Sequence, residues 1–169
     1  LAGPGALLGA FPASIDVTPD GLYTFSANFN LHGDMVPSSV SVVYVPNMTE
    51  VARIVTCTMP HGSRVSPDGR FQYSGCMMDD ELVEIDTRTM AVSRRFSVAK
   101  GKEAPLAASG GEMLKMWMDG ARRVSNGETN DPAQVGYLAM EGHKHAMEPN
   151  SCSPTWAQPS ATGAKIYVA

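Results

Sequence analysis

The sequence predicts an all-β fold assembled from repeated four-stranded sheets. Two observations lead to this prediction: a turn-and-strand unit that recurs along the chain, and a high content of turn residues, with 16 Gly and 12 Pro in 169 residues. Such a content is typical of short strands joined by tight turns. Hydrophobic residues make up 43% of the chain and charged residues 18%, which is the balance of a folded domain.

The recurring unit occupies residues 11–27 and again residues 59–75, 48 positions further on (11 to 59). A third copy occupies residues 153–169, where Gly163 and Tyr167 stand 94 positions after their counterparts in the second copy (69 to 163). A match of this length and order indicates a repeat architecture rather than chance similarity.

The centre of the first two copies is a Ser/Thr-Pro-Asp-Gly sequence, at 18–21 and 66–69. Pro fixes its own φ, Asp accepts hydrogen bonds from the backbone ahead, and Gly adopts a positive φ, so the sequence predicts a tight turn. Val, Ile, Tyr and Phe alternate with other residues on both sides, and we therefore expect an antiparallel strand on each side of the turn.

Two further strands follow in each of the first two copies. We expect third strands at 40–45 and 81–85, and fourth strands at 51–55 and 91–96. Four antiparallel strands in roughly 40 residues are typical of a β-propeller blade.

The predicted organisation is therefore part of a single β-propeller domain over residues 1–169. The expected blades span about 11–58, 59–101 and, incomplete, 150–169, with an inter-blade insertion at 102–149. Propeller rings typically close with roughly four to eight blades. Because soluble proteins avoid unpaired sheet edges, we expect the chain to be a fragment, or to be completed by blades from elsewhere.

The sequence VSPDG at 65–69, followed by EIDTRT at 84–89 and a fourth strand, resembles the repeat of YVTN-type (YncE-like) seven-bladed β-propellers. The resemblance covers residues 11–101 and 150–169. It implies a periplasmic, extracellular or cell-surface protein, because that family is mostly exported.

Three cysteines are present, and they form no Cys-x-x-Cys metal pair. The family resemblance places an Asn after the second strand, which is Asn28 in the first copy, whereas Cys76 stands there in the second. A disulfide between Cys76 and Cys152 would tie the insertion to the ring in an oxidising compartment. Spacing alone leaves the choice of pair open.

Charge and hydropathy argue against nucleic acid as a partner and against a membrane-spanning segment. Lys and Arg total 13 against 17 Asp and Glu, a net charge of -4, and basic residues cluster only as isolated pairs. Nucleic acid is not expected as a partner, because phosphate binding needs clustered cations. No apolar stretch approaches the roughly 18 residues of a membrane span, and residues 1–11 lack the features of a signal peptide.

The insertion begins with capping-box spacing at 109–112, which predicts a short helix over 111–124. Its second half is expected to be a polar loop that covers one face of the ring.

The chain has 11 Met, several of them close to His or Cys. Thioether, imidazole and thiolate ligands together suit copper, so copper is the expected cofactor if there is one. The candidate ligands are His143, His145, Met147, His61, Met59 and Cys76. The alternative is that the helix Met residues pack in the core and that the His-x-His-x-Met run is a solvated loop.

The first strand of each blade lines the channel of a propeller, so residues at its start belong to the channel mouth. The residue after the aligned Pro is Ala13, His61 and Thr155 in the three copies. His61 and Arg64 are the chemically capable candidates there, and Trp156 offers either a stacking wall or packing between blades. Each also has a purely structural interpretation.

Acidic residues gather at 79–81, which we interpret as a solvated turn, with a hard cation such as Ca²⁺ as the alternative. The sequence contains no Gly-rich phosphate loop, nucleophile elbow or zinc-protease helix. We therefore expect a binding or scaffold protein, without catalytic residues, that takes a protein partner or small ligand at one face. The alternatives are a propeller enzyme or subunit (lactonase-like, quinoprotein dehydrogenase-like or copper reductase-like) and a cell-surface structural module.

Overall fold

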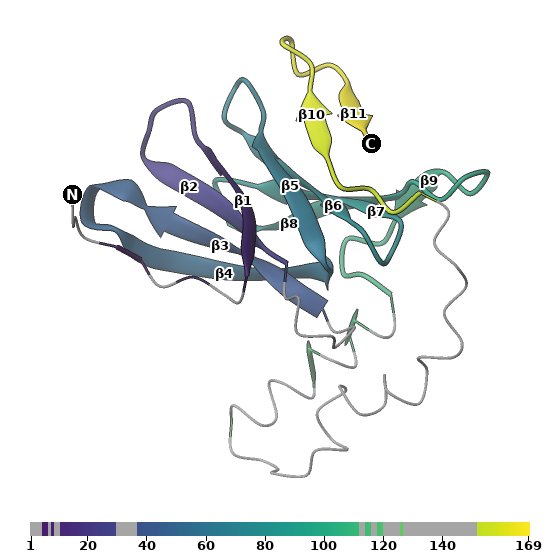
Figure 1. The fold of residues 1–169 in the computed structure, drawn as a ribbon, viewed down its shortest axis with the longest axis horizontal. Coiled ribbons are helices and arrows are strands. Elements are labelled where there is room, and N and C mark those ends of the chain that lie inside the picture. Colours follow the sequence, from purple (N-terminus) through teal and green to yellow (C-terminus); the bar gives the residue numbers. More distant parts are fainter. Residues whose placement is uncertain are drawn as a thin grey trace.

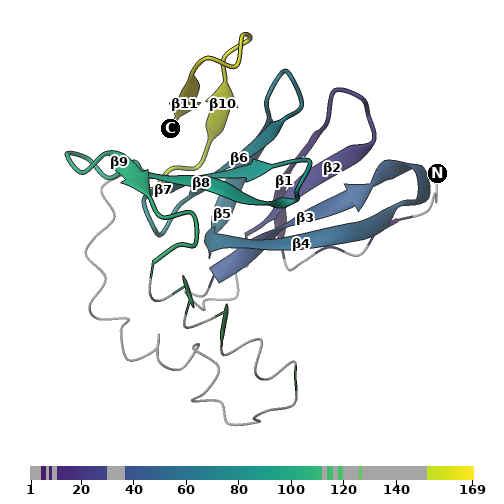
Figure 2. The same ribbon diagram turned by 180° about the vertical axis from the view of Figure 1, so that it is seen from behind.

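The computed structural model describes residues 5–6, 8, 11–29, 37–111, 114–115, 118–119, 126 and 152–169. Its strands form three antiparallel sheets, shown from opposite sides in Figures 1 and 2. The predicted all-β class with antiparallel, propeller-like blades is confirmed. The described part of the chain contains no helix with the length and apolar character needed to cross a membrane.

Each sheet is a meander in which consecutive strands are neighbours. The first sheet consists of β1 (Pro12–Val17), β2 (Tyr23–Asn28), β3 (Pro37–Tyr44) and β4 (Thr49–Thr58), with the 3₁₀ turn η1 (Val45–Asn47) between β3 and β4. The second consists of β5 (Pro60–Val65), β6 (Phe71–Cys76), β7 (Glu81–Asp86), β8 (Ala91–Ser97) and β9 (Ala104–Leu106). The third is the hairpin β10 (Ala157–Pro159) and β11 (Ile166–Val168).

The second sheet differs from the expected four strands in having a fifth strand, β9, on its outer edge. This strand lies in the stretch that the sequence assigned to the insertion. Beyond it, the four described residues Leu114, Lys115, Met118 and Asp119 are helical, and the Lys115 N–H donates to the Gly111 carbonyl.

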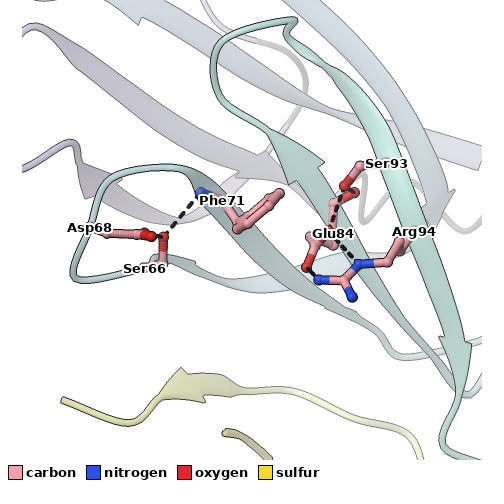
Figure 3. A network of polar contacts seen from close by, with 6 residues as sticks. All are labelled: Ser66, Asp68, Phe71, Glu84, Ser93 and Arg94. Atoms are coloured by element: carbon pink, nitrogen blue, oxygen red, sulfur yellow. Dashed lines mark hydrogen bonds and ion pairs between the residues drawn. The ribbon is translucent and has the colours of Figure 1, made fainter. Parts of the chain in front are cut away.

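The turn between the first two strands has the same hydrogen bonds in all three sheets. In the second sheet, Gly69 N–H donates to the Ser66 carbonyl (2.8 Å) and Ser66 N–H donates to the Phe71 carbonyl (2.7 Å). The Ser66 hydroxyl donates to Asp68 (2.6 Å) and accepts from Phe71 N–H (3.0 Å), as Figure 3 shows. The same bonds occur in the first sheet, made by Thr18, Asp20, Gly21 and Tyr23. They occur again in the third sheet, where the side-chain contacts are longer, made by Ser160, Thr162, Gly163 and Lys165.

The three turn glycines have φ values of +73°, +73° and +70°, as the predicted turn requires. The repeat is therefore conformational as well as sequential. The three hairpins stand side by side with their turns on the same edge of the molecule (Figure 1).

Apolar clusters fill the space between successive sheets. The first cluster joins Phe25, Val40, Val42, Ile54 and Cys57 of the first sheet to Cys76, Val83 and Ile85 of the second. The second cluster joins Tyr73 and Leu82 to Ala157 of the third sheet. Strand β5 contacts both β1 and β10, so the first strands of the three sheets lie next to one another. This is the packing of successive propeller blades, and the sheets are called the first, second and third blade below.

A disulfide between Cys57 and Cys76 joins the first two blades. Cys57 is on β4 and Cys76 on β6, both are buried, and their Cα atoms are 5.9 Å apart. The predicted pairing of Cys76 with Cys152 is wrong: Cys152 is a free, exposed thiol. The physical reason is that blade packing brings the ends of β4 and β6 together across the first apolar cluster.

The turn of the second blade also packs against the turn of the first blade. A Cβ added at Gly69 would lie 3.1 Å from the Pro19 side chain, whereas one added at Gly21 would meet nothing within 4 Å. The two glycines share the same φ, and of the two only Gly69 has a neighbouring turn beside it among the described residues.

We predict that Gly21→Ala lowers the free energy of unfolding by about 1 kcal/mol, because Ala disfavours positive φ. Gly69→Ala should cost more, about 2 kcal/mol in all, because its Cβ also crowds the neighbouring blade. Urea unfolding of both variants measures the difference. Equal losses would contradict the close apposition of the two turns.

Candidate functional site

His61 and Arg64, both predicted at the channel mouth, point to the same face of the second blade. His61 pairs with Gly75 and Arg64 with Tyr73, with a bulge between the two pairs. Because Gly75 and Tyr73 are two positions apart on β6, they share a face, and so do their partners. In a regular strand, residues three positions apart would face opposite sides, so the bulge creates this pair.

Gly62 makes the bulge and brings the third blade close. Its φ is +58°, and a Cβ there would lie 2.5 Å from the Thr155 carbonyl oxygen and 2.7 Å from the Trp156 Cα. No other residue fits this space, so Gly62 sets how closely β5 and the start of the third blade approach each other. A glycine inside a strand is the sequence signal for such a bulge.

Arg64 reaches across to the third blade and stacks on Trp156. Its Cζ atom lies 4.1 Å from the centre of the Trp156 ring, a cation–π contact, and its Nε donates to Gln158 Oε1 (3.3 Å). Its Nη1 donates to the Ser63 carbonyl (2.9 Å). The ion pairs among the described residues do not include Arg64, so neutral groups alone hold its charge in place.

His61 also bridges the two blades. Its Nδ1 lies 2.8 Å from the Thr155 carbonyl oxygen. Because a carbonyl oxygen can only accept, we assign the hydrogen to Nδ1, which leaves a lone pair on Nε2 of the neutral ring. The Phe29 ring stands edge-on to the imidazole, with the ring centroids 5.2 Å apart. With the hydrogen on Nδ1, Nε2 is able to accept a hydrogen bond or to bind a cation.

The start of the third copy is anchored by Asp80. Its Oδ1 accepts hydrogen bonds from the N–H groups of Cys152 (3.1 Å) and Ser153 (2.7 Å). Asp79 accepts from Thr58 N–H (2.7 Å), and burial raises the pKa of its carboxyl above the usual range. The prediction of a solvated acidic turn at 79–81 is wrong, since Asp80 is only 7% exposed. These carboxylates join chain segments.

The buried Arg95 has a similar joining role. It pairs with Glu81 (3.0 Å) and donates to the carbonyl groups of Thr56 in the first blade and Ala108 beyond β9. The Arg95 guanidinium therefore bonds to the first blade, to the second blade and to the segment that follows β9.

A third charged group, Glu84 with Arg94, lies on the face of the second blade that carries Tyr73. Arg94 donates from Nε (2.8 Å) and Nη2 to the two oxygens of Glu84, and Ser93 donates to one of them (2.6 Å), as Figure 3 shows. Burial would raise the pKa of Glu84, but these bonds outweigh it and hold the pKa below its usual value. Burial, and the negative charge of Glu84, raise the pKa of Tyr73.

The structure leaves fewer candidate copper ligands than the sequence predicted. Cys76 is wrong as a thiolate ligand because its sulfur is in the disulfide. Met59 precedes β5 with a positive φ of 54°, and its carbonyl accepts from Met77 N–H. His143, His145 and Met147 lie outside the described residues. Within the described ranges, no three His, Cys, Asp or Glu side chains gather as a metal would require.

Gln158, which accepts a hydrogen bond from Arg64, was not among the predicted site residues. The repeat contained the signal, because Asp16, Arg64 and Gln158 occupy equivalent positions (16 to 64 to 158). Asp16 likewise reaches the next blade, where its Oδ2 accepts from Val65 N–H (2.8 Å). The polar residues at this position of the three copies therefore all take part in hydrogen bonds between adjacent first strands.

No protein-family model and no curated protein matches the chain. Solved structures similar to it include Kuenenia stuttgartiensis hydrazine synthase, with 34% identity over 50% of this chain and 23% of that one, at a TM-score of 0.44. The Myceliophteria thermophila Cps50 (Swd1) β-propeller domain has 12% identity over 55% of this chain and 27% of that one, at a TM-score of 0.46. Dihydro-heme d1 dehydrogenase NirN, in complex with DHE, has 17% identity over 57% of this chain and 21% of that one, at a TM-score of 0.45. The chain thus spans only 21–27% of the length of these proteins.

We predict that Glu84→Gln lowers the free energy of unfolding by about 2 kcal/mol at pH 7, because an amide cannot receive both donors of Arg94. The pKa of Glu84 is lower in the folded protein, so its stabilising effect is present above the unfolded pKa, about 4.3, and is lost as pH falls through the folded value. Urea unfolding from pH 7 to pH 3 should therefore show the gap between variant and parent closing.

The matched control is Glu50→Gln, which affects an exposed pair with Arg53. It should change the unfolding free energy by less than about 1 kcal/mol at any of these pH values. A gap for Glu84→Gln that stays constant with pH would mean that Glu84 is not an ionised partner of Arg94.

Proposed function

We propose that this chain supplies blades to an exported β-propeller that binds a partner or small ligand at the inner edge of its second and third blades. The observation that carries the proposal is the bulge at Gly62, which sets His61 and Arg64 on one face beside the exposed Trp156. Three side chains with different chemistry meet there, and the two that come from the second blade contact the third.

The chemistry of these residues favours an anionic ligand. Arg64 is a permanent cation, oriented by the Trp156 ring and Gln158 and not neutralised by a carboxylate of the described residues. Of the five N–H groups of a guanidinium, two are engaged, and the others are able to donate to a carboxylate or phosphate. Nε2 of His61 would accept from a hydroxyl group on the same ligand. We therefore propose a small hydroxylated acid as the ligand class.

The YVTN-type repeat family and export from the cytoplasm are part of the same proposal. The support for export is the Cys57–Cys76 disulfide, since structural disulfides persist in oxidising compartments and are rare in the cytosol. The support for the repeat family is the resemblance of its sequence, together with the backbone hydrogen bonds that the three turns share.

Copper association is retained as a proposal with fewer ligands. His61 is the candidate that geometry favours, because metal-binding histidines commonly donate their other N–H to a carbonyl, as Nδ1 does here. His61→Ala should weaken Cu(I) binding, measured by competition with a chromophoric chelator. An unchanged affinity would remove His61 from the ligand set.

The ligand site is tested by NMR of the Trp156 indole N–H and the Arg64 Nε–H. Phosphate, simple carboxylates and hydroxy acids are titrated in turn into isotope-labelled protein. We expect saturable shifts of both signals for the hydroxy acids. Arg64→Ala should weaken that binding at least about tenfold, the loss of one charge-assisted hydrogen bond.

Arg88→Ala is the matched control, because Arg88 is an exposed arginine on the turn between β7 and β8. It should bind as the parent protein does. The ligand site would be refuted if no anion shifted either signal, or if Arg64→Ala and Arg88→Ala bound equally well.

A further inference from the structure

The outer edges of the first two blades are not equivalent. In the second blade, β9 covers the edge of β8 through the pairs Arg95–Leu106, Phe96–Pro105 and Ser97–Ala104. In the first blade, the order of the described strands ends at β4. The chain therefore adds a fifth strand to one blade and leaves the corresponding edge of the other open among its described residues.

The strand registers show which part of β4 corresponds to the covered part of β8. In the first blade, Ala27 pairs with Val40 and Val40 pairs with Ile54. In the second blade, Gly75, which is equivalent to Ala27 in the repeat, pairs with Leu82, and Leu82 pairs with Phe96. Ile54 therefore takes the place of Phe96. Its neighbours Arg53 and Val55 take the places of Arg95 and Ser97.

The backbone of this segment is set up for pairing. Pro105 has no N–H, so its pair with Phe96 is a non-hydrogen-bonded one, and the bonds to β9 come from the flanking Arg95 and Ser97. By the same register, Arg53 and Val55 direct their N–H and C=O groups away from β3, toward the open edge.

A groove of about 700 Å³ is lined by Arg53, Ile54 and Val55 of this segment. Met90 and Val92 of the second blade also line it, with Leu114 and Met118 from the segment beyond β9. Its volume is in the range of ligand sites, roughly 300–1,000 Å³. An open strand edge and an apolar groove thus coincide where the second blade has its fifth strand.

We infer that this edge of β4 binds an extended peptide of a partner protein, which becomes the fifth strand of the first blade. Main-chain hydrogen bonds to Arg53 and Val55 supply the affinity. Cross-strand partners share a face, so the peptide residue opposite Ile54 points toward Met90 and Val92 and must be apolar. This rim surface is separate from the ligand site at the inner edge, and it does not depend on the proposed ligand.

The test uses amide hydrogen exchange of the whole chain, observed by NMR. The probe is a synthetic peptide with the sequence of residues 102–108 in which Pro105 is replaced by Val, a mimic of β9 with a full set of N–H groups. We expect the amides of Arg53 and Val55 to exchange rapidly in the free protein. Exchange should slow about tenfold when the peptide occupies about nine-tenths of the molecules, because only the unbound remainder then exchanges.

Two variants separate edge pairing from groove packing. Val55→Pro removes one edge N–H and should abolish binding of the peptide. Met118→Asp replaces an apolar lining side chain with a carboxylate and should weaken binding at least about tenfold, because the bound peptide would remove that carboxylate from water. Val51→Asp is the matched control, since Val51 is as exposed as Met118 (46% against 45%) and lies outside the groove. It should bind normally.

Slow exchange of Val55 in the free protein would overturn the inference. If the protection is independent of protein concentration, another segment of this chain fills the edge, and if it grows with concentration, a second copy does. Unchanged binding by both Val55→Pro and Met118→Asp would also overturn it. Because this readout is at β4 and the NMR signals of the ligand site are at Arg64 and Trp156, failure of one proposal is distinguishable from failure of the other.

Discussion

The structure depends on the packing of one blade against the face of the next. The apolar cluster between β2–β4 of the first blade and β6–β7 of the second is fixed by the Cys57–Cys76 disulfide. Without this contact, each of the two sheets would expose an apolar face to water, at roughly 25 cal/mol for each Å² of that face. The inner-edge residues and the outer groove both lie at boundaries between blades, so both exist only because the blades pack in this way.

The same boundary carries different chemistry from one repeat to the next. On the face of the first blade that meets the second, Val42 occupies the position that Glu84 holds in the second blade. Glu84 needs Arg94 and Ser93 to be stable there. Along the first strands, Asp16, Arg64 and Gln158 occupy one equivalent position and all take part in bridges to a neighbouring blade. His61 and Arg64 therefore combine a structural bond with free hydrogen-bonding atoms.

Local features of this fold were predictable and long-range ones were not. The two Pro-Asp-Gly turns and their flanking strands followed from residues close together in sequence, and the third turn has the same backbone hydrogen bonds. The partner of Cys76 depends on how two blades stack, and no spacing rule contains that information. The shared face of His61 and Arg64 depends on one extra residue at a bulge, which reverses the alternation on which strand patterns rely. Strand β9 is three residues long and has no alternation of its own.

The central claim, that the first two blades pack face to face, is tested most directly by mapping the disulfide in unreduced protein. Blade packing predicts a peptide pair linked through Cys57 and Cys76 in mass spectrometry, and one reactive thiol, that of Cys152, in the native protein. A link from Cys76 to Cys152, or three reactive thiols in protein purified from an oxidising compartment, would contradict it.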